Sequence, residues 1–231
     1  MWTNWDELPE NMQTEQVRPY YEQLNQKRGS LILKRGFDVV ISLLMLILLS
    51  WLFLILAIAI KVDSQGPVFY RQVRVTTGNR DFRIFKFRTM VSNADKIGSL
   101  VTTGNDARIT RVGAKIRKCR LDEIPQLLNI LKGEMSFVGT RPEVRKYVDR
   151  YTDEMMATLL LPAGVTSLAS ISFKDEDELL DQYTKKGMSI DDAYVEKVLP
   201  EKMKFNLEYL KQCGFFQDIK LMLNTVVSVM K

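Results

Sequence analysis

The longest hydrophobic pattern along the chain is the apolar run from Val39 to Ile60, 22 residues without a charged side chain. A helix of this length would cross the hydrocarbon core of a bilayer, which is about 30 Å thick. Lys34 and Arg35 precede the run and Lys61 follows it. Basic residues at both ends also suit a segment that enters and leaves at one membrane face. A buried core helix is the third alternative.

Two segments rich in aromatic and β-branched residues, Val68 to Val75 and Phe82 to Arg88, follow the apolar run. A Thr-Thr-Gly-Asn-Arg turn at residues 76–80 separates them, and this arrangement predicts a β-hairpin. Lys86 and Arg88 would share one face of the second strand. The pair would form either a phosphate clamp or, as is commoner, a solvated surface.

Two adjacent carboxylates, Asp122 and Glu123, stand before Pro125 and an apolar run, Leu127 to Leu131, that ends at Gly133. The pattern predicts a short helix with both acids in its first turn. Basic residues lie just upstream, so both carboxylates are expected to be ionised near neutral pH. Ionised carboxylates can attack phosphorus or hold a divalent cation, although helix capping alone also explains acids at this position.

Arg141 stands between Gly139-Thr140 and Pro142. Glycine and proline are expected to fix this loop, and a fixed guanidinium is what bidentate phosphate binding requires. Glu143 is expected to open a helix that runs to Met155, with core-facing apolar positions at helical spacing. The last segment, residues 215–231, has a similar apolar stripe and would either lie in the headgroup region of a membrane or pack in the core.

Charge is distributed unevenly along the 231 residues. The formal net charge is +5, but residues 61–121 hold fourteen Lys or Arg against four acids, so the middle of the chain favours an anionic ligand. The sequence contains no histidine and two cysteines, Cys119 and Cys213, without metal-ligand spacing. A histidine base and histidine-ligated metals are therefore excluded, and any metal would need hard oxygen ligands.

The first 33 residues are polar and carry scattered aromatic residues, among them Trp5, Tyr20 and Tyr21. They lack the apolar core and small-residue cleavage site of a signal peptide. The aromatic side chains would either anchor at a membrane interface or pack on the domain.

Several motifs in a fixed order resemble the bacterial sugar transferases, the monotopic phosphoglycosyl transferases. In chain order they are Lys34–Asp38, the apolar run, Gly66–Gln72, Phe85–Met90, Leu121–Leu127 and Met135–Glu143. The resemblance extends from about residue 34 to the C-terminus. The family's usual Ser-Pro pair in the apolar helix is Ser50-Trp51 here, and the usual proline before Arg141 is Thr140.

The resemblance implies an α+β fold: a small, mostly helical domain with a β-hairpin, one re-entrant membrane helix near the N-terminus and interfacial amphipathic helices. It implies an enzyme that moves a sugar 1-phosphate from a UDP-sugar to undecaprenyl phosphate, releases UMP and starts the assembly of a bacterial glycan. Asp122 would be the nucleophile that forms a phosphosugar intermediate, and Glu123 with Asp122 would hold Mg²⁺. The implied phosphate-binding residues are Lys86, Arg88, Arg117 and Arg141, and the supporting residues are Glu143 and Asp218.

The expected organisation has three regions: a polar N-terminal extension (1–33), a re-entrant membrane helix (34–61) broken at Ser50, and a cytoplasmic catalytic domain at the membrane surface (62–231). The expected location is the cytoplasmic face of the bacterial inner membrane. UDP-sugar and undecaprenyl phosphate are the expected partners, and no nucleic acid is expected. The oligomeric state stays open, with the N-terminal segment a candidate homodimer interface.

Two other functions are compatible with the same residues. One is a non-catalytic membrane-anchored scaffold whose basic surface binds anionic lipid. The other is a metal-dependent hydrolase of nucleotide sugars, which would release UMP without a lipid acceptor.

Overall fold

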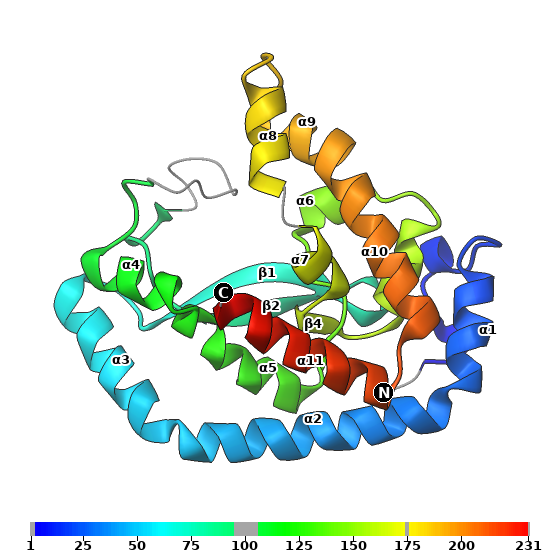
Figure 1. Cartoon of the computed structure of the whole chain (residues 1–231), viewed down its shortest axis with the longest axis horizontal. Coiled ribbons are helices and arrows are strands. Elements are labelled where there is room, and N and C mark those ends of the chain that lie inside the picture. Colours follow the sequence, from blue (N-terminus) through cyan, green and yellow to red (C-terminus); the bar gives the residue numbers. More distant parts are fainter. Residues whose placement is uncertain (1–2, 95–105, 174–175, 231) are drawn as a thin grey trace.

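A computed structural model of the chain describes residues 3–94, 106–173 and 176–230. Its lower edge in Figure 1 is a pair of consecutive helices, α2 (Arg28–Leu48) and α3 (Ser50–Asp63), and the rest of the chain lies above them. Helices and two small sheets are mixed in one body. The expected α+β class is confirmed.

The predicted β-hairpin is present. Strand β1 (Phe69–Thr76) pairs antiparallel with β2 (Arg80–Phe87) in a register that runs from Phe69 opposite Phe87 to Thr76 opposite Arg80. The turn between them, η3 (Thr77–Asn79), places Gly78 and Asn79 at positive φ, which glycine and asparagine adopt at low cost. A second sheet was not predicted: β3 (Met135–Val138) pairs parallel with β4 (Ala163–Thr166).

Short helices surround the two sheets and form most of the remaining chain. In chain order they are η1 (Trp5–Glu7), η2 (Glu10–Met12), α1 (Arg18–Gln26), α4 (Arg111–Lys118), η5 (Leu121–Gln126), α5 (Leu127–Lys132), α6 (Arg145–Val148), η6 (Met155–Leu160), α7 (Leu168–Ser172), α8 (Glu176–Thr184), α9 (Ile190–Ala193), η7 (Tyr194–Val198), α10 (Leu199–Gln212) and α11 (Phe215–Met230).

The prediction of one continuous helix from Glu143 to Met155 is wrong. α6 covers only Arg145–Val148, and a new helix, η6, begins at Met155, whose backbone N–H donates to the Thr152 hydroxyl at 3.4 Å. Tyr147 and Val148 are nevertheless buried, as expected of core positions. Apolar spacing identified the core residues, but it cannot show that the chain restarts its helix between them.

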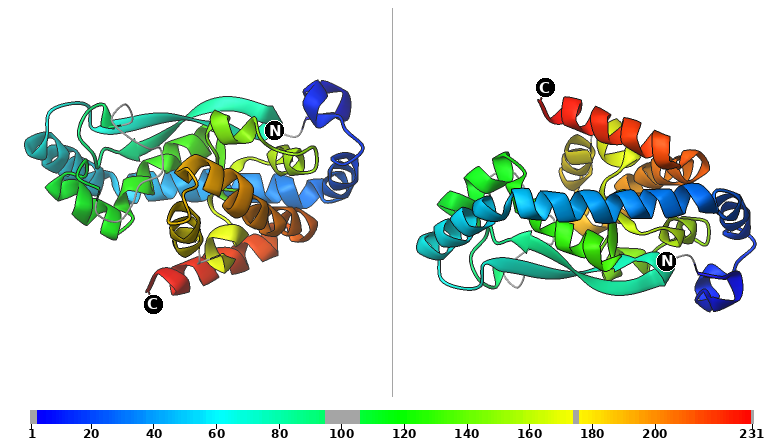
Figure 2. Two further views of the ribbon diagram at one scale, coloured as in Figure 1. Left: turned by 90° about the horizontal axis from the view of Figure 1, so that it is seen from above. Right: turned by 90° about the horizontal axis from the view of Figure 1, so that it is seen from below.

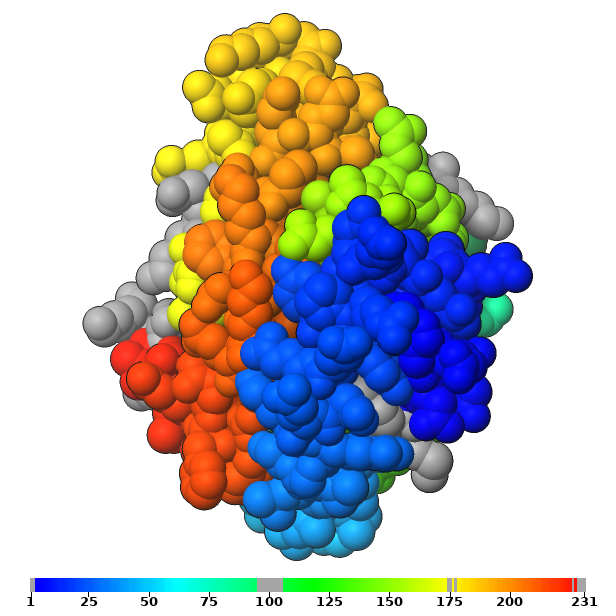
Figure 3. Space-filling model, turned by 90° about the vertical axis from the view of Figure 1, so that its right-hand side faces the viewer, coloured from blue at the N-terminus to red at the C-terminus, as the bar shows by residue number. Residues whose placement is uncertain are grey.

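The first residues pack into the main core. Leu8, Met12, Val17 and Leu24 are buried in one cluster with residues of η6 and α10 that include Leu160. Figure 3 shows this N-terminal segment, in dark blue, against the orange helix α10. The Trp5 and Tyr21 rings meet edge to face at 5.2 Å, and the Tyr20 hydroxyl donates to Glu154 at 2.7 Å. These aromatic side chains therefore pack on the domain.

The apolar run forms two helices that meet at a bend. In the described part of the chain no single helix is long and apolar enough to cross a membrane; α2 and α3 together meet that test, but they are bent by 62°. Leu49 lies between them, and Ser50 is the first residue of α3. Proline is absent from the bend. Leu56 and Ile60 of α3 pack on Phe87 and Ile116, whereas α2 packs on α5, so each half is held by different tertiary contacts.

Apolar side chains remain exposed along these helices and along α11. Figure 2 shows α2 and α3 crossing the lower face between α11 and the β1–β2 hairpin. The most exposed large apolar residues on the three helices are Ile32, Ile47, Leu48, Trp51, Leu54, Val62, Phe216 and Leu223. Leu221 of α11 is buried, so this helix presents one face to the protein and another outward.

Candidate active site

The acid pair lies where the sequence predicted it, at the start of a short helical segment. Asp122 and Glu123 occupy the first turn of η5, which is a 3₁₀ helix that includes Pro125 and continues directly into α5. Arg120 precedes η5 in the left-handed region at φ 52°, and Gly133 ends α5 at φ 82°. The proline and glycine signals thus located both ends, while the tighter 3₁₀ geometry was not predicted.

Glu123 is held by two cations from distant parts of the chain. Its Oε1 accepts from Lys86 Nζ at 2.8 Å and from Arg141 Nη2 at 2.6 Å. Burial acts to raise the pKa of Glu123, but attraction by Arg141 and Lys86 outweighs burial and holds this pKa well below its usual value. Glu123 is therefore ionised at neutral pH, as expected.

Asp122 has a different environment although it is the next residue. Burial is the largest influence and raises the pKa of Asp122; Lys86 opposes the shift, Glu123 adds to it and Arg117 opposes it. Asp122 forms no direct ion pair with any residue that the structure describes. A partly desolvated carboxylate of this kind is a better nucleophile than one held by two cations. The two acids are thus equipped for different tasks.

Arg141 owes its position to a close approach of two backbone segments. Gly139, at the end of β3, lies so near β4 that an added Cβ would lie 2.5 Å from the Pro162 carbonyl oxygen. The Gly164 backbone N–H also donates to the Thr140 carbonyl at 2.8 Å. Glycine is required here by space, and the resulting loop directs the Arg141 guanidinium to Glu123. The prediction that this loop is fixed is in accord with these contacts.

Two cavities meet at the acid pair. A cavity of about 520 Å³, here called the basic cavity, is lined by Asp122 and by cations that include Lys86, Arg88 and Arg117. A second cavity of about 770 Å³, here called the large cavity, is lined by Glu123. Because Lys86 borders the basic cavity and Arg141 borders the large one, the Lys86–Glu123–Arg141 contact forms the boundary between them.

The large cavity extends from helices α2 and α11 to helices α7, α8 and α10. Met45 of α2 and Thr225 of α11 line it on one side, and Ser170, Glu176 and Lys202 line another part. Arg120 and Thr166 also line the cavity. The apolar part of its wall is formed by Ile124, Leu127, Phe137, Val165, Ile171 and Phe173. A cavity of this size accommodates a small organic ligand.

Arg88 is buried and forms hydrogen bonds with the end of helix α3. Its Nη2 donates to the Ser64 carbonyl at 2.7 Å and to the Ser64 hydroxyl at 3.0 Å, just beyond the end of α3. Among the residues that the structure describes, Nε and Nη1 of the same guanidinium are buried and have no hydrogen-bond partner. Arg88 therefore fastens α3 to β2 and also borders the basic cavity, whereas Lys86 reaches Glu123.

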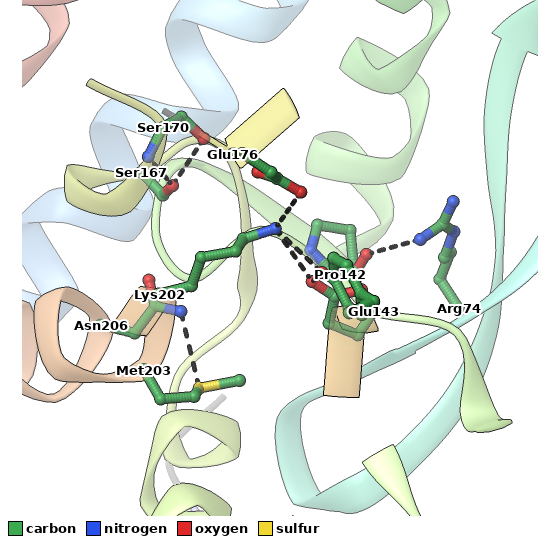
Figure 4. Close-up of polar contacts among 10 residues, drawn as sticks. Arg74, Pro142, Glu143, Ser167, Ser170, Glu176, Lys202, Met203 and Asn206 are labelled. Carbon is green, nitrogen blue, oxygen red and sulfur yellow. Dashed lines mark hydrogen bonds and ion pairs between the residues drawn. The ribbon is translucent and has the colours of Figure 1, made fainter. Parts of the chain in front are cut away.

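The two residues expected to support the site, Glu143 and Asp218, contact other side chains than those of the acid pair. Glu143 is buried, and its Oε1 accepts from the Tyr194 hydroxyl at 2.5 Å and from Lys202 Nζ at 3.4 Å (Figure 4). Asp218 of α11 forms an ion pair of 2.5 Å with Lys34 of α2 and accepts from the Tyr209 hydroxyl at 3.0 Å. Asp218 thus joins α11 to α2, while Glu143 holds the wall of the large cavity.

Sequence reasoning missed Lys202, Glu176 and Ser170, which line the large cavity. One signal was available for Lys202: it falls on the buried stripe of α10 beside Leu199, Met203 and Asn206, where a charged residue is expected only with partners. Ser170 and Glu176 carry no comparable signal, because their position depends on how α7 and α8 fold over the site.

Carboxylates that could hold a metal ion are few. Within residues 3–94, 106–173 and 176–230 no group of three or more His, Cys, Asp or Glu side chains is arranged as a metal site. Asp122 and Glu123 are adjacent hard-oxygen donors, and Mg²⁺ commonly uses one or two carboxylates together with substrate phosphates and water. The donor set fits that mode of binding.

Comparison with known proteins identifies the family. A family model described as bacterial sugar transferase matches residues 29–231. The chain is 35% identical over 201 residues to a UDP-N-acetylgalactosamine-undecaprenyl-phosphate N-acetylgalactosaminephosphotransferase of Aeromonas hydrophila, a match that covers 86% of this chain and 44% of that protein. It is 33% identical over 200 residues to a UDP-glucose:undecaprenyl-phosphate glucose-1-phosphate transferase of Escherichia coli, covering 84% of this chain and 39% of that protein.

The chain thus spans less than half the length of these two relatives. An uncharacterized sugar transferase of Bacillus subtilis is 31% identical over 202 residues, and this match covers 87% of the chain and 88% of the relative. The residues that the family model matches include the acid pair, its cationic partners and the residues that line both cavities. This chain belongs to the bacterial sugar transferase family.

Proposed function

We propose that the protein transfers a sugar 1-phosphate from a UDP-sugar to undecaprenyl phosphate, with Asp122 as the nucleophile. The observation that carries this proposal is the division of labour in the acid pair: Glu123 is ion-paired to Lys86 and Arg141, while Asp122 borders the basic cavity. The names of the Aeromonas and Escherichia relatives, which specify a UDP-sugar and undecaprenyl phosphate, support both substrates.

In the first step an oxygen of the Asp122 carboxylate attacks the phosphorus that carries the sugar. The bond from that phosphorus to the bridging oxygen of the diphosphate breaks, and UMP leaves with the electron pair. In the second step a phosphate oxygen of undecaprenyl phosphate attacks the same phosphorus, and the bond to Asp122 breaks. The carboxylate is restored, and the undecaprenyl diphosphate sugar would start a bacterial glycan. Two displacements replace one difficult transfer between anions.

Cations around the acid pair suit this reaction. Lys86, Arg88 and Arg117 border the basic cavity, where they would neutralise the diphosphate and the departing UMP. Arg141 would contact the transferred phosphate from the other side of Glu123. Asp122 and Glu123 would hold Mg²⁺ together with phosphate oxygens, and the ion would supply further neutralisation of negative charge.

A membrane location with a re-entrant segment is supported by the packing of the chain's two ends. Residues before α2, such as Met12 and Leu24, share one hydrophobic cluster with residues after α3, such as Leu160 and Leu210. A bilayer cannot separate side chains that are in one core, so α2 and α3 would dip into the membrane and return. Their bend of 62° and exposed apolar side chains suit that path.

The cytoplasmic face of the bacterial inner membrane is the location we propose, because UDP-sugars are made in the cytoplasm. The large cavity is bordered by Met45 of α2 and Thr225 of α11, two helices with exposed apolar surface. A polyprenyl phosphate in the bilayer could thus bring its phosphate to Glu123 and Arg141 while its chain stays in lipid.

The test uses the full chain in lipid nanodiscs with Mg²⁺ and a panel of UDP-sugars, and it measures UMP with and without undecaprenyl phosphate. The proposal expects steady UMP release only when the right UDP-sugar and the lipid are both present. Steady release without lipid would identify a hydrolase, and no release with any UDP-sugar would favour the lipid-binding scaffold. Mass spectrometry of a reaction quenched before lipid addition should find the phosphosugar on Asp122; an adduct on another residue would overturn its role.

A further inference from the structure

One part of the large cavity has a polar wall unlike the phosphate-binding region around Arg141. Lys202 of α10 is buried there, and its Nζ lies 2.9 Å from the Tyr194 hydroxyl, 3.3 Å from Glu176 Oε1 and 3.4 Å from Glu143 Oε1. Figure 4 shows Lys202 between Glu176 on one side and Glu143 on the other. Side chains from the loop before α6, from α8 and from η7 thus converge on one ammonium group of α10.

The ionic partners of Lys202 make this group a poor site for phosphate. Its ammonium is already paired with Glu143 and Glu176, and the Glu176 carboxylate, which lines the large cavity, would repel an anion placed beside it. Tyr194 adds no charge, because burial and Glu143 raise its pKa well above the usual value. Carboxylate oxygens accept hydrogen bonds and the ammonium donates them, a combination that suits a neutral ligand rich in hydroxyl groups.

Other residues of the same wall fit such a ligand. Ser170, exposed on α7, and Phe173, just beyond it, both line the large cavity. The Ser170 hydroxyl can form a hydrogen bond with a hydroxyl group of a pyranose ring. The aromatic ring of Phe173 offers an apolar surface for the C–H groups of the same sugar. Arg141 and Glu123 line the same cavity. A ligand whose phosphate contacts Arg141 therefore has a cavity with polar and aromatic walls available for the group attached to that phosphate.

We propose that Glu176, Lys202, Ser170 and Phe173 form the subsite for the sugar of the nucleotide sugar, and that this subsite selects neutral hexoses or N-acetylhexosamines over hexuronates. The proposal rests on the proposed transferase function and adds the residues and the class of sugar. Glu176 is the member most available to the ligand. Its side chain is 34% exposed, and its Oε1 lies 3.3 Å from Lys202 Nζ. Glu143, in contrast, is 8% exposed and is occupied by Tyr194.

The test compares Glu176→Gln with Glu178→Gln, which removes an exposed carboxylate from the same helix. The full chain in nanodiscs, carrying Asp122→Asn in parent and variants so that no phosphosugar bond forms, is titrated by calorimetry with UMP and with the UDP-sugar of a panel that binds the Asp122→Asn parent most tightly. Glu176→Gln should weaken binding of the UDP-sugar roughly tenfold, the effect of one hydrogen bond to a charged group, and leave UMP binding unchanged. Glu178→Gln should change neither affinity. Ser170→Ala, on a different helix, should also weaken the UDP-sugar selectively.

Turnover provides a second readout that a merely structural role would not move. Glu176→Gln removes a negative charge that disfavours a hexuronate. The ratio of kcat/KM for the UDP-hexose to kcat/KM for the matching UDP-hexuronate should therefore fall roughly tenfold. The KM for undecaprenyl phosphate should stay unchanged. An unchanged ratio, or a rise only in KM for undecaprenyl phosphate, would overturn the sugar subsite; the second result would assign this wall to the acceptor. If the parent releases UMP from no UDP-sugar, the transferase function fails instead, and the calorimetric comparison still decides the subsite.

Discussion

Asp122 and Glu123 are consecutive residues, yet they border different cavities and their pKa values shift in opposite directions. Glu123 is fixed by Lys86 and Arg141, and Asp122 is raised in pKa by burial. The Glu123 carboxylate is thus held in ion pairs with two cations, whereas we propose that the Asp122 carboxylate reacts. It also makes the roles of the two acids separable by experiment.

Replacing Asp122 by Asn should abolish turnover and preserve the fold. We expect UMP release to fall on the order of 10³-fold or more, because the amide cannot form the phosphosugar bond. Burial disfavours the ionised Asp122, so the neutral amide should leave the thermal midpoint unchanged or raise it. Asp149→Asn, at a carboxylate that is 61% exposed, is the control. Parent-like turnover in Asp122→Asn would exclude Asp122 as the nucleophile.

The acidic limb of the pH–rate profile should reflect the ionisation of Asp122. The reactive form is the carboxylate and burial raises its pKa, so kcat/KM should fall with decreasing pH at a higher pH than for an ordinary aspartate. Arg117 lowers this pKa, and Arg117→Gln should therefore move the limb to higher pH. Lys118→Gln, at the exposed neighbour, should not move it. A limb that shifts to lower pH in Arg117→Gln would contradict the assignment.

Glu123→Gln should destabilise the protein at neutral pH. The variant leaves Lys86 and Arg141 without their shared carboxylate, and the loss should be about 3 kcal/mol, the low end for breaking a buried ion pair. Because the pKa of Glu123 is lowered in the folded state, its contribution is present above the unfolded value and is lost as pH falls below it. Denaturant unfolding at neutral and acidic pH should show the gap between parent and variant closing in acid.

The matched control is Glu22→Gln, which breaks an exposed ion pair with Arg18 whose side chains are 62% and 63% exposed. That change should cost less than about 1 kcal/mol. Equal losses in Glu22→Gln and Glu123→Gln, or a gap that widens in acid, would contradict the assigned role of Glu123.

Gly139→Ala should displace the Arg141 loop. The added Cβ would lie 2.5 Å from the Pro162 carbonyl and 3.0 Å from the Gly164 backbone nitrogen, so backbone must move at a cost of about 1 to 3 kcal/mol. Activity should fall as well, because Arg141 would lose its alignment with Glu123. Gly36→Ala, in open space within α2, should instead raise stability by up to about 1 kcal/mol. A fully active and equally stable Gly139→Ala would exclude the steric explanation.

Both ends of the α2–α3 segment should lie on one side of the membrane. Cys119 is exposed after the segment, and Gln16 is exposed before it. A membrane-impermeant maleimide should label Cys119, and likewise Gln16→Cys in a Cys119→Ser background, in inside-out vesicles but not in spheroplasts. Labelling of the two positions from opposite sides would show a spanning helix and contradict the re-entrant path.

Local signals in the sequence predicted the elements that carry the site. Segments rich in aromatic and β-branched residues on both sides of a Gly-Asn turn predicted the hairpin, and proline and glycine marked the ends of the segment with Asp122 and Glu123. These predictions succeeded because turn and helix-end preferences depend on a few neighbouring residues. The β3–β4 pairing was missed because it joins residues 28 positions apart, from Met135 to Ala163, and such pairing depends on the whole fold.

The sequence by itself determined that a cationic chain without histidine carries an acid pair at a helix start, a constrained Arg141 loop and a long apolar segment. Tertiary structure alone decided that Lys86 and Arg141 meet at Glu123, that Arg88 fastens α3, and that Lys202 borders the large cavity. The family resemblance suggested a break at Ser50, and the structure places the bend at the adjacent Leu49, where proline is absent. The physical reason is that chain-local preferences set the conformation of short segments, whereas ion pairs and cavities form only when distant segments pack together.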